Sequence, residues 1–160
     1  KIAHFIHKIP NIGLRFFNVY GPVKKNNFLF SGVISIFIDL IQKEKELSIY
    51  GEGQEIRDFV YVEDVVRALC LSMESLENTP WKFSSNVYNV ATGKGTSVLE
   101  LVKLLEELLG KKTQPLFFPK KDGSIQNSIG DVSKISKDLG FLSEISLEQG
   151  LKKTITQIEN

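Results

Sequence analysis

Two spacings of apolar residues recur along the 160-residue chain. Apolar positions three or four apart predict a helix, and short apolar or alternating runs bounded by turn residues predict a strand. We expect helical segments at 1–8, 31–42, 63–75, 97–109, 131–139 and 146–158. We expect strands at 13–17, 47–50, 59–62, 87–90 and 113–118. Together these elements predict an α/β chain.

Polar residues at the predicted ends sharpen the helix boundaries. Ser31 is the expected N-cap of the helix at 31–42. The Ser97-x-x-Glu100 spacing is that of a capping box, in which the two side chains satisfy amides at the start of a helix. Residues 18–22 form a predicted turn. The apolar residues of the helix at 63–75 that we expect to face inward are Val65, Val66, Leu69, Cys70 and Met73.

Composition limits the classes of function. With 42% hydrophobic residues, the chain is long enough for one domain with a core. Its net charge of +1 gives no electrostatic basis for binding nucleic acid or a membrane surface. The single cysteine, Cys70, excludes an internal disulfide framework and predicts a cytoplasmic protein with a core thiol. Because the chain opens with Lys1, we expect it to be a piece of a longer protein.

Arg57 is the residue whose surroundings best fit ligand binding. It lies between the glycine turn at 51–53 and the predicted buried strand at 59–62. A planar guanidinium held in that position suits a phosphate or a carboxylate. The alternative is that Arg57 only pairs with Asp58 or Glu63 on a solvated loop.

The chain contains no convincing catalytic motif. Tyr20 and Lys24 have Tyr-x-x-x-Lys spacing, but that dyad needs a helix, which Pro22 prevents. The glycine pairs at 51–53 and 93–95 each lack the third glycine of a dinucleotide-binding fingerprint. His4 and His7 have no further ligands beyond Cys70 to complete a metal site, so we predict no metal and no catalytic residue within the chain.

Three blocks in a fixed order carry a family resemblance: GLRFFNVYGP, LSIYGEGQEIRDFVYVEDVVRAL and VYNVATGKGTSVLELV. They resemble the extended short-chain dehydrogenase/reductase superfamily, in its NAD-dependent epimerase/dehydratase branch, and UDP-glucose 4-epimerases in particular. The resemblance runs from Gly13 to Thr154 but corresponds only to the second half of such an enzyme. It implies that 1–160 is a single fragment, without the N-terminal dinucleotide-binding half. Such a fragment would hold the last strands of a Rossmann-type parallel sheet and the smaller substrate-binding lobe.

The resemblance also implies roles for individual residues. Asn18 would hydrogen-bond the nucleotide-sugar, Arg57 would bind its pyrophosphate, and Tyr50 would stack near the base. The alternatives are that Asn18 stabilises its own turn and that Tyr50 belongs to the core. Backbone contacts to the ligand would come from Ser31, Gly32, Val33, Leu47 and Ser48. Phe16 and Val19, in the block beside the nicotinamide, would contact NAD.

The sequence departs from the family pattern near its end. Lys121 and Ser124 stand where the family usually has an arginine and an aspartate that hold the phosphates and the ribose. Lysine keeps the charge but loses the bidentate fork, and serine cannot accept two ribose hydroxyls as a carboxylate can. We therefore expect altered affinity or substrate choice.

The parent enzyme implied by the resemblance is a homodimeric UDP-sugar 4-epimerase of surface polysaccharide synthesis. The alternatives are a 4,6-dehydratase or reductase of the same superfamily, and a truncated product that is only a nucleotide-binding module. We expect the fragment alone to be inactive, because the cofactor fingerprint and the dyad would precede Lys1. The absent half should leave an apolar patch at the broken sheet edge, with a tendency to associate.

Overall fold

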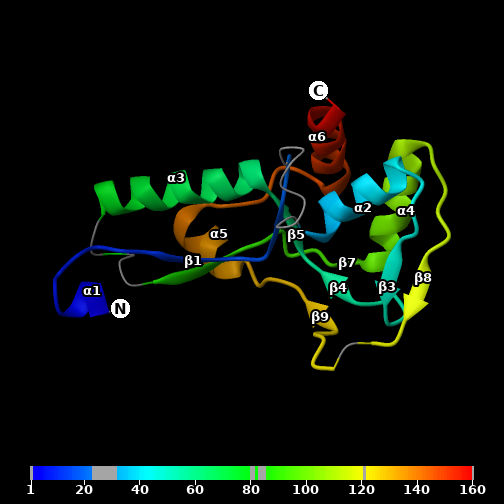
Figure 1. The fold of residues 1–160 in the computed structure, drawn as a ribbon. Coiled ribbons are helices and arrows are strands. Elements are labelled where there is room, and N and C mark those ends of the chain that lie inside the picture. Colours follow the sequence, from blue (N-terminus) through cyan, green and yellow to red (C-terminus); the bar gives the residue numbers. More distant parts are fainter. Residues whose placement is uncertain (1, 23–31, 80–81, 83–85, 121, 160) are drawn as a thin grey trace.

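The computed structural model describes residues 2–22, 32–79, 82, 86–120 and 122–159, and within them helices and strands alternate (Figure 1). The helices are α1 (Ile2–Phe5), α2 (Val33–Gln42), α3 (Val62–Asn78), α4 (Val98–Leu109), α5 (Ser133–Leu139) and α6 (Leu147–Glu159). The longer strands are β1 (Gly13–Phe16), β2 (Asn18–Tyr20), β3 (Ser48–Tyr50), β5 (Phe59–Tyr61), β6 (Val87–Val90) and β8 (Leu116–Phe118). Three strands of two residues complete the set: β4 (Ile56–Arg57), β7 (Thr96–Ser97) and β9 (Asn127–Ser128).

Parallel pairing dominates the strands. β1 pairs with β6, β2 with β5, and β3 with β8, each in parallel. β4 lies between β7, which is antiparallel to it, and β9, which is parallel. Because parallel strands cannot be joined by a tight turn, every parallel pair brings together segments distant in sequence. The predicted α/β class with parallel strands is confirmed.

Two hydrophobic clusters form the core. In the first, α2 packs beside α4 over β3 and β5, and α6 closes the cluster. Its most enclosed side chains include Ile38, Leu47, Leu101, Leu105 and Leu151. In the second, α3 and α5 cover β5 and β6, with Val60, Tyr88 and Phe141 fully enclosed. β5 contributes to both clusters and so links them.

The capping box predicted at Ser97 and Glu100 and the glycine turn predicted at 51–53 are confirmed. Ser97 and Glu100 form the capping box in both directions, with Ser97 N–H donating to Glu100 Oε2 at 2.7 Å. These hydrogen bonds lower the pKa of Glu100. Gly110 ends α4 in the left-handed conformation that favours glycine. Gly51 and Gly53 also have positive φ, as their predicted turn requires.

Two predicted boundaries are wrong. Residues 18–20 form strand β2 rather than a turn, because β5 supplies backbone partners alongside, and Asn18 N–H donates to Asp58 O at 3.0 Å. Helix α2 takes Gly32 as its N-cap, with no side-chain cap. Ser31, which we expected to cap this helix, lies outside the described residues.

The inward face predicted for α3 is also wrong in part. Val65 is buried as expected, but Val66, Leu69 and Met73 are 53%, 43% and 61% exposed, and Cys70 is exposed as well. The buried face carries Asp64, Val65, Ala68 and Ser72 instead. The helix was correctly predicted as amphipathic, but no described element covers its second apolar stripe.

That stripe adjoins the free edge of β1. Ile12, Leu14 and Phe16 line a groove of about 330 Å³ together with Leu69, Met73 and two further residues of α3. Within the described chain, β1 pairs only with β6, so its other edge has no strand partner. We call this surface the β1–α3 face. Its exposed apolar side chains match the patch expected where half of a sheet is absent.

The β1–α3 face predicts dye binding and self-association. Replacing Leu69 and Met73 together by glutamate should abolish most of the fluorescence of an apolar dye bound to the chain, because both exposed side chains lie on this face. The matched control is Ile125→Glu, which changes an equally exposed residue between β8 and β9 and should leave the fluorescence unchanged. An unmodified chain that binds no dye would contradict the prediction.

Candidate functional site

The carboxylate of Asp58 joins three separate segments. Asp58 is fully buried between β4 and β5. Its Oδ1 accepts hydrogen bonds from Thr92 N–H at 2.8 Å and Thr92 Oγ1 at 2.7 Å. Its Oδ2 accepts from Gly93 N–H at 2.9 Å and Gly130 N–H at 3.1 Å. Four donors satisfy the charge inside the protein, and they hold the segments after β6 and β9 against the strand that carries Arg57.

Arg57 forms no ion pair within the described part of the chain. Asp58 is engaged as above, and Glu63 pairs with Lys153 at 2.6 Å. The alternative of a local Arg57 pair with either carboxylate is therefore wrong. Arg57 is half-buried, and its Nη1 donates to the carbonyl of Ile56 at 2.8 Å. The guanidinium keeps further donors for an external anion.

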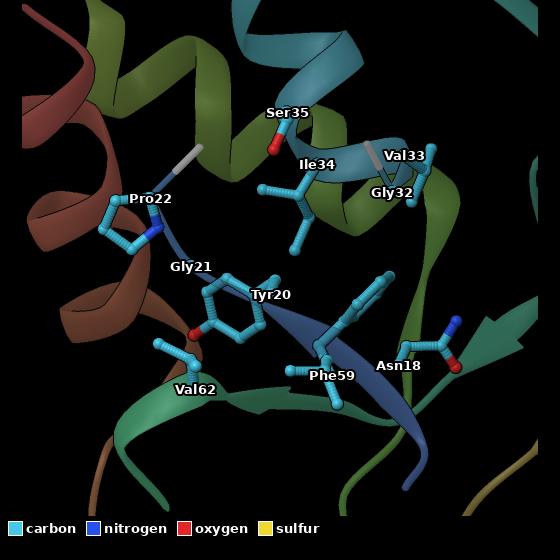
Figure 2. Close-up of a pocket in the computed structure, with 11 residues that line it drawn as sticks. Asn18, Tyr20, Gly21, Pro22, Gly32, Val33, Ile34, Ser35, Phe59 and Val62 are labelled. Carbon is cyan, nitrogen blue, oxygen red and sulfur yellow. The ribbon is translucent and has the colours of Figure 1, made fainter. Parts of the chain in front are cut away.

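A cavity of about 300 Å³ lies between β2, the start of α2, the first residue of β5 and the first residue of α3 (Figure 2). Its volume is at the lower end of the range for small-molecule sites. Asn18, Gly32 and Val33, three of the predicted substrate-binding residues, lie in its wall together with Val19. The remaining lining residues are Tyr20, Gly21, Pro22, Ile34, Ser35, Phe59 and Val62.

Asn18 brings a free amide to this cavity. Its backbone is fixed by the parallel register with Phe59 and by the hydrogen bond to Asp58 O. Its half-buried side chain makes no hydrogen bond to any described residue, so it does not stabilise a turn of its own. Figure 2 shows the amide projecting on the side of the cavity where Val33 lies. A side-chain amide in this position can both donate to and accept from a ligand.

The first turn of α2 forms another wall. Gly32 is exposed and in extended conformation, and its carbonyl accepts from Ser35 N–H at 3.1 Å. The first amides of a helix lack intrahelical partners and carry the positive end of the helix dipole. Since no side chain caps α2, the amides of Val33 and Ile34 are available to an anion, whereas those of Ser35 and Ile36 donate to the Gly32 carbonyl.

Tyr20 is a structural residue and not a proton-transfer group. Its hydroxyl donates to Leu147 O at 3.2 Å, and a side-chain carbon at Gly150 would lie 2.1 Å from that hydroxyl oxygen. Burial, with smaller contributions from Tyr61 and Asp64, raises the pKa of Tyr20 well above its usual value. This agrees with rejecting Tyr20 as the tyrosine of a catalytic dyad. Lys24 lies outside the described residues.

Other predicted substrate residues lie away from the cavity. Leu47 is fully buried in the core, and its carbonyl accepts from Leu116 N–H at 2.9 Å. Ser48 and Tyr50 point outward from β3, and Tyr50 is 48% exposed, with its ring centroid 5.7 Å from that of Phe118. The core alternative for Tyr50 is therefore wrong. Arg57 does not line the cavity either. The carbonyl of the next residue, Asp58, accepts the hydrogen bond from Asn18 N–H.

The two residues that depart from the family pattern are only partly described. Ser124 has a buried hydroxyl oxygen without a hydrogen-bond partner among the described residues. Lys121 lies outside them, as does Ser31. The cavity also contains three residues that the sequence patterns did not indicate: Ser35, Phe59 and Val62. The only available signal was that Phe59 begins the predicted strand two residues after Arg57.

The residues predicted to contact NAD are exposed but line different hollows. Phe16, 48% exposed, lines the groove of the β1–α3 face, whereas Val19, 39% exposed, lines the cavity. Gly93 N–H already donates to Asp58, and Gly95 packs too closely against Ile56 for a side chain to fit. The contact of Phe16 and Val19 with NAD stays a prediction.

Among the described residues, no group of three potential metal-binding side chains comes together. No described helix has the length and apolarity needed to cross a bilayer.

Parallel strand pairs flanked by helices, with a cavity beside them, are characteristic of Rossmann-type α/β proteins. The sequence model of the NAD dependent epimerase/dehydratase family matches residues 4–91, which are 88 of the 160 residues. The chain therefore belongs to the NAD-dependent epimerase/dehydratase family.

Relatives within this family are about twice as long as the chain. UDP-glucose 4-epimerase of Thermotoga maritima, solved with UDP-glucose, is 39% identical with a TM-score of 0.82, covering 92% of this chain and 45% of its own. UDP-glucuronic acid 4-epimerase of Bacillus cereus, solved with UDP-glucuronic acid and NAD, is 28% identical with a TM-score of 0.85, covering 99% and 48%. UDP-glucuronate 4-epimerase of Thermodesulfobacterium geofontis is 31% identical over 95% of this chain and 44% of its own. The chain thus spans about half the length of the curated relatives it matches.

Tyr20 predicts a loss of stability at high pH. Unfolded tyrosine ionises near pH 10, whereas the pKa of Tyr20 in the folded chain is raised. Above about pH 10 the unfolded chain releases this proton first, so the free energy of unfolding falls as pH rises toward the folded pKa. The free energy of unfolding is measured by urea titration at a series of alkaline pH values. For Tyr20→Phe it should decline less steeply with pH than for the unmodified chain. Equal slopes would contradict the burial of this hydroxyl.

Proposed function

We propose that this chain is the substrate-binding portion of an NAD-dependent nucleotide-sugar epimerase that acts on a UDP-sugar in surface polysaccharide synthesis. The three relatives named above are UDP-sugar 4-epimerases, and the two solved ones hold UDP-glucose or UDP-glucuronic acid. The whole enzyme would be a cytoplasmic homodimer. The other half of its length would hold most of the NAD and the acid/base residues.

The observation that carries the proposal is the free Asn18 amide beside the uncapped N-terminus of α2. An amide and unpaired helix amides are suitable donors for the oxygens of a diphosphate. Arg57 adds a guanidinium without a carboxylate partner, on the strand segment that precedes Phe59 of the cavity wall. A bidentate guanidinium suits a diphosphate that extends out of the cavity toward β4.

The chemistry would be divided between this chain and the rest of the enzyme's length. NAD, when bound, supplies the hydride acceptor for oxidation of a sugar carbon. The residues described here would bind and orient the nucleotide-sugar, and Phe16 and Val19 would offer apolar side chains to the cofactor. Tyr20 is unsuited to act as the base, because its hydroxyl is held by Leu147. The proton-transfer groups would come from the rest of the enzyme.

Arg57 provides the direct test of ligand binding. Arg57→Ala should weaken the binding of UDP-glucose to the 160-residue chain by roughly tenfold or more, because charge-assisted hydrogen bonds to phosphate are lost. Affinity is measured by titration, with NMR shift changes at Asn18 and the first turn of α2 locating the site.

The matched control is Arg15→Ala, which removes an exposed arginine from β1. It should bind UDP-glucose as the unmodified chain does. Equal affinity in the Arg57 variant would remove Arg57 from the site. No shift changes in the unmodified chain would overturn the proposed function.

A second test concerns turnover. The 160-residue chain supplied with NAD and UDP-glucose should form no UDP-galactose, because the Tyr20 hydroxyl is held by Leu147 and Gly93 N–H is held by Asp58. Product is measured by chromatography of the nucleotide-sugars, with a full-length epimerase as the positive control. Measurable conversion by the chain alone would show that it contains the catalytic groups.

A further inference from the structure

Strand β1 offers backbone hydrogen-bonding groups along its open edge. Gly13 N–H donates to Asn86 O at 2.9 Å, and Phe17 N–H donates to Val90 O at 3.1 Å, so the odd-numbered residues of this segment face β6. Because the backbone groups of successive residues in a strand point to opposite edges, those of Leu14 and Phe16 point away from β6. A further strand placed on that side would find donors and acceptors already in position.

The side chains beside this edge are apolar and open to solvent. Leu14 and Phe16 of β1 share the groove of the β1–α3 face with Leu69 and Met73, and α3 runs alongside β1 (Figure 1). Phe16, Leu69 and Met73 are all exposed. Parallel sheets are normally covered by helices on both faces. The groove therefore fits an apolar helix next to the strand that would complete the edge.

The pairing pattern and the lengths of the relatives indicate which polypeptide fits. Each pair among the longer described strands is parallel, and a further parallel strand continues that arrangement. The chain covers 45% and 48% of the two solved relatives named above, so more than half of each relative lies outside the shared part. That length is sufficient for several strand-and-helix units of about 30 residues each.

The open edge leads directly to the candidate cavity. β1 continues through Phe17 into β2, whose first residue, Asn18, lines the cavity. A strand added in parallel to β1 would have its carboxyl end beside Phe16, at the same end of the sheet as Asn18. Ligands of open parallel sheets bind at the carboxyl ends of the strands. Docking at this edge would therefore bring the loops of the added polypeptide to the cavity.

We propose that the β1–α3 face is a docking surface for a strand-and-helix polypeptide of the same family, whose strand joins β1 in parallel and whose helix fills the groove. The occupant is the part of the family's length that this chain does not match, and it binds here even when it is supplied as a separate chain. This inference rests on the family and on the geometry of β1, and not on the identity of the substrate.

The test is co-expression of the 160-residue chain with the part of Thermotoga maritima UDP-glucose 4-epimerase that it does not match, which carries an affinity tag. The two should co-purify in equal amounts. Leu69→Glu combined with Met73→Glu should reduce co-purification by roughly tenfold or more, because two charges would be buried in an apolar groove. Ile125→Glu, at an exposed residue outside this face, should leave it unchanged.

Amide hydrogen exchange distinguishes strand addition from unspecific apolar contact. In the complex, exchange at Leu14 and Phe16 should slow by roughly tenfold or more, because their N–H groups gain partners. Exchange at Arg15 should change less, because its N–H already points toward β6. Unchanged exchange at Leu14 and Phe16 would overturn the strand pairing.

The control pair is the same tagged part with the remainder of the Thermotoga enzyme. If this pair assembles and the 160-residue chain does not co-purify, the docking surface is overturned. Self-association of the chain through β1 that the tagged part cannot displace would assign the face to a second copy and would also overturn it. Circular dichroism of each variant distinguishes lost docking from lost folding.

Turnover of the complex is a separate measurement. Supplied with NAD and UDP-glucose, the complex should form UDP-galactose, which the 160-residue chain alone should not. Turnover would support both the docking surface and the proposed function. A complex that assembles with slowed exchange at Leu14 and Phe16 but without turnover would uphold the docking surface and count against the proposed epimerase function.

Discussion

The buried Asp58 carboxylate is the interaction on which the candidate site depends. A carboxylate without water must be hydrogen-bonded on both oxygens, and four donors from Thr92, Gly93 and Gly130 meet this need. The backbone carbonyl of the same residue holds Asn18. One residue therefore anchors the loop after β6, the segment after β9 and the start of β2. The positions of Arg57 on one side and Asn18 on the other both follow from it.

Local features of the structure were predictable from the sequence. The capping box at Ser97 and Glu100 depends on neighbours within three residues and is observed. The strand at 87–90 was predicted from its own apolar pattern, although its partner strand β1 is distant in sequence. The family resemblance grouped Asn18, Gly32 and Val33 with Leu47, Ser48, Tyr50 and Arg57, and the cavity contains the first three but none of the other four. Asn18 begins β2, whereas Gly32 and Val33 begin α2.

Features that depend on distant partners were not predictable. The hydrogen-bond partners of the Asp58 carboxylate lie 34 to 72 residues away in the sequence. No local pattern therefore shows that these segments bind Asp58 and leave Arg57 without an ion pair among the described residues. Residues 18–20 were predicted as a turn from their local residue types. They form a strand because residues 59–61, which are distant in sequence, pair with them. The face of α3 that turns inward is set by packing against β5, β6 and the loop that Asp64 holds through Glu144 N–H. Amphipathicity alone does not show which of two apolar stripes is covered.

Gly150 links α6 to the cavity, although it is distant from the lining residues in sequence. The backbone of α6 approaches the Tyr20 ring so closely that no side chain fits between them, and the same residue lines the cavity. A side chain at position 150 would have to displace the Tyr20 ring. Helix α6 thus supports the cavity wall from behind, and a substitution there would change the shape of the wall without changing any lining residue.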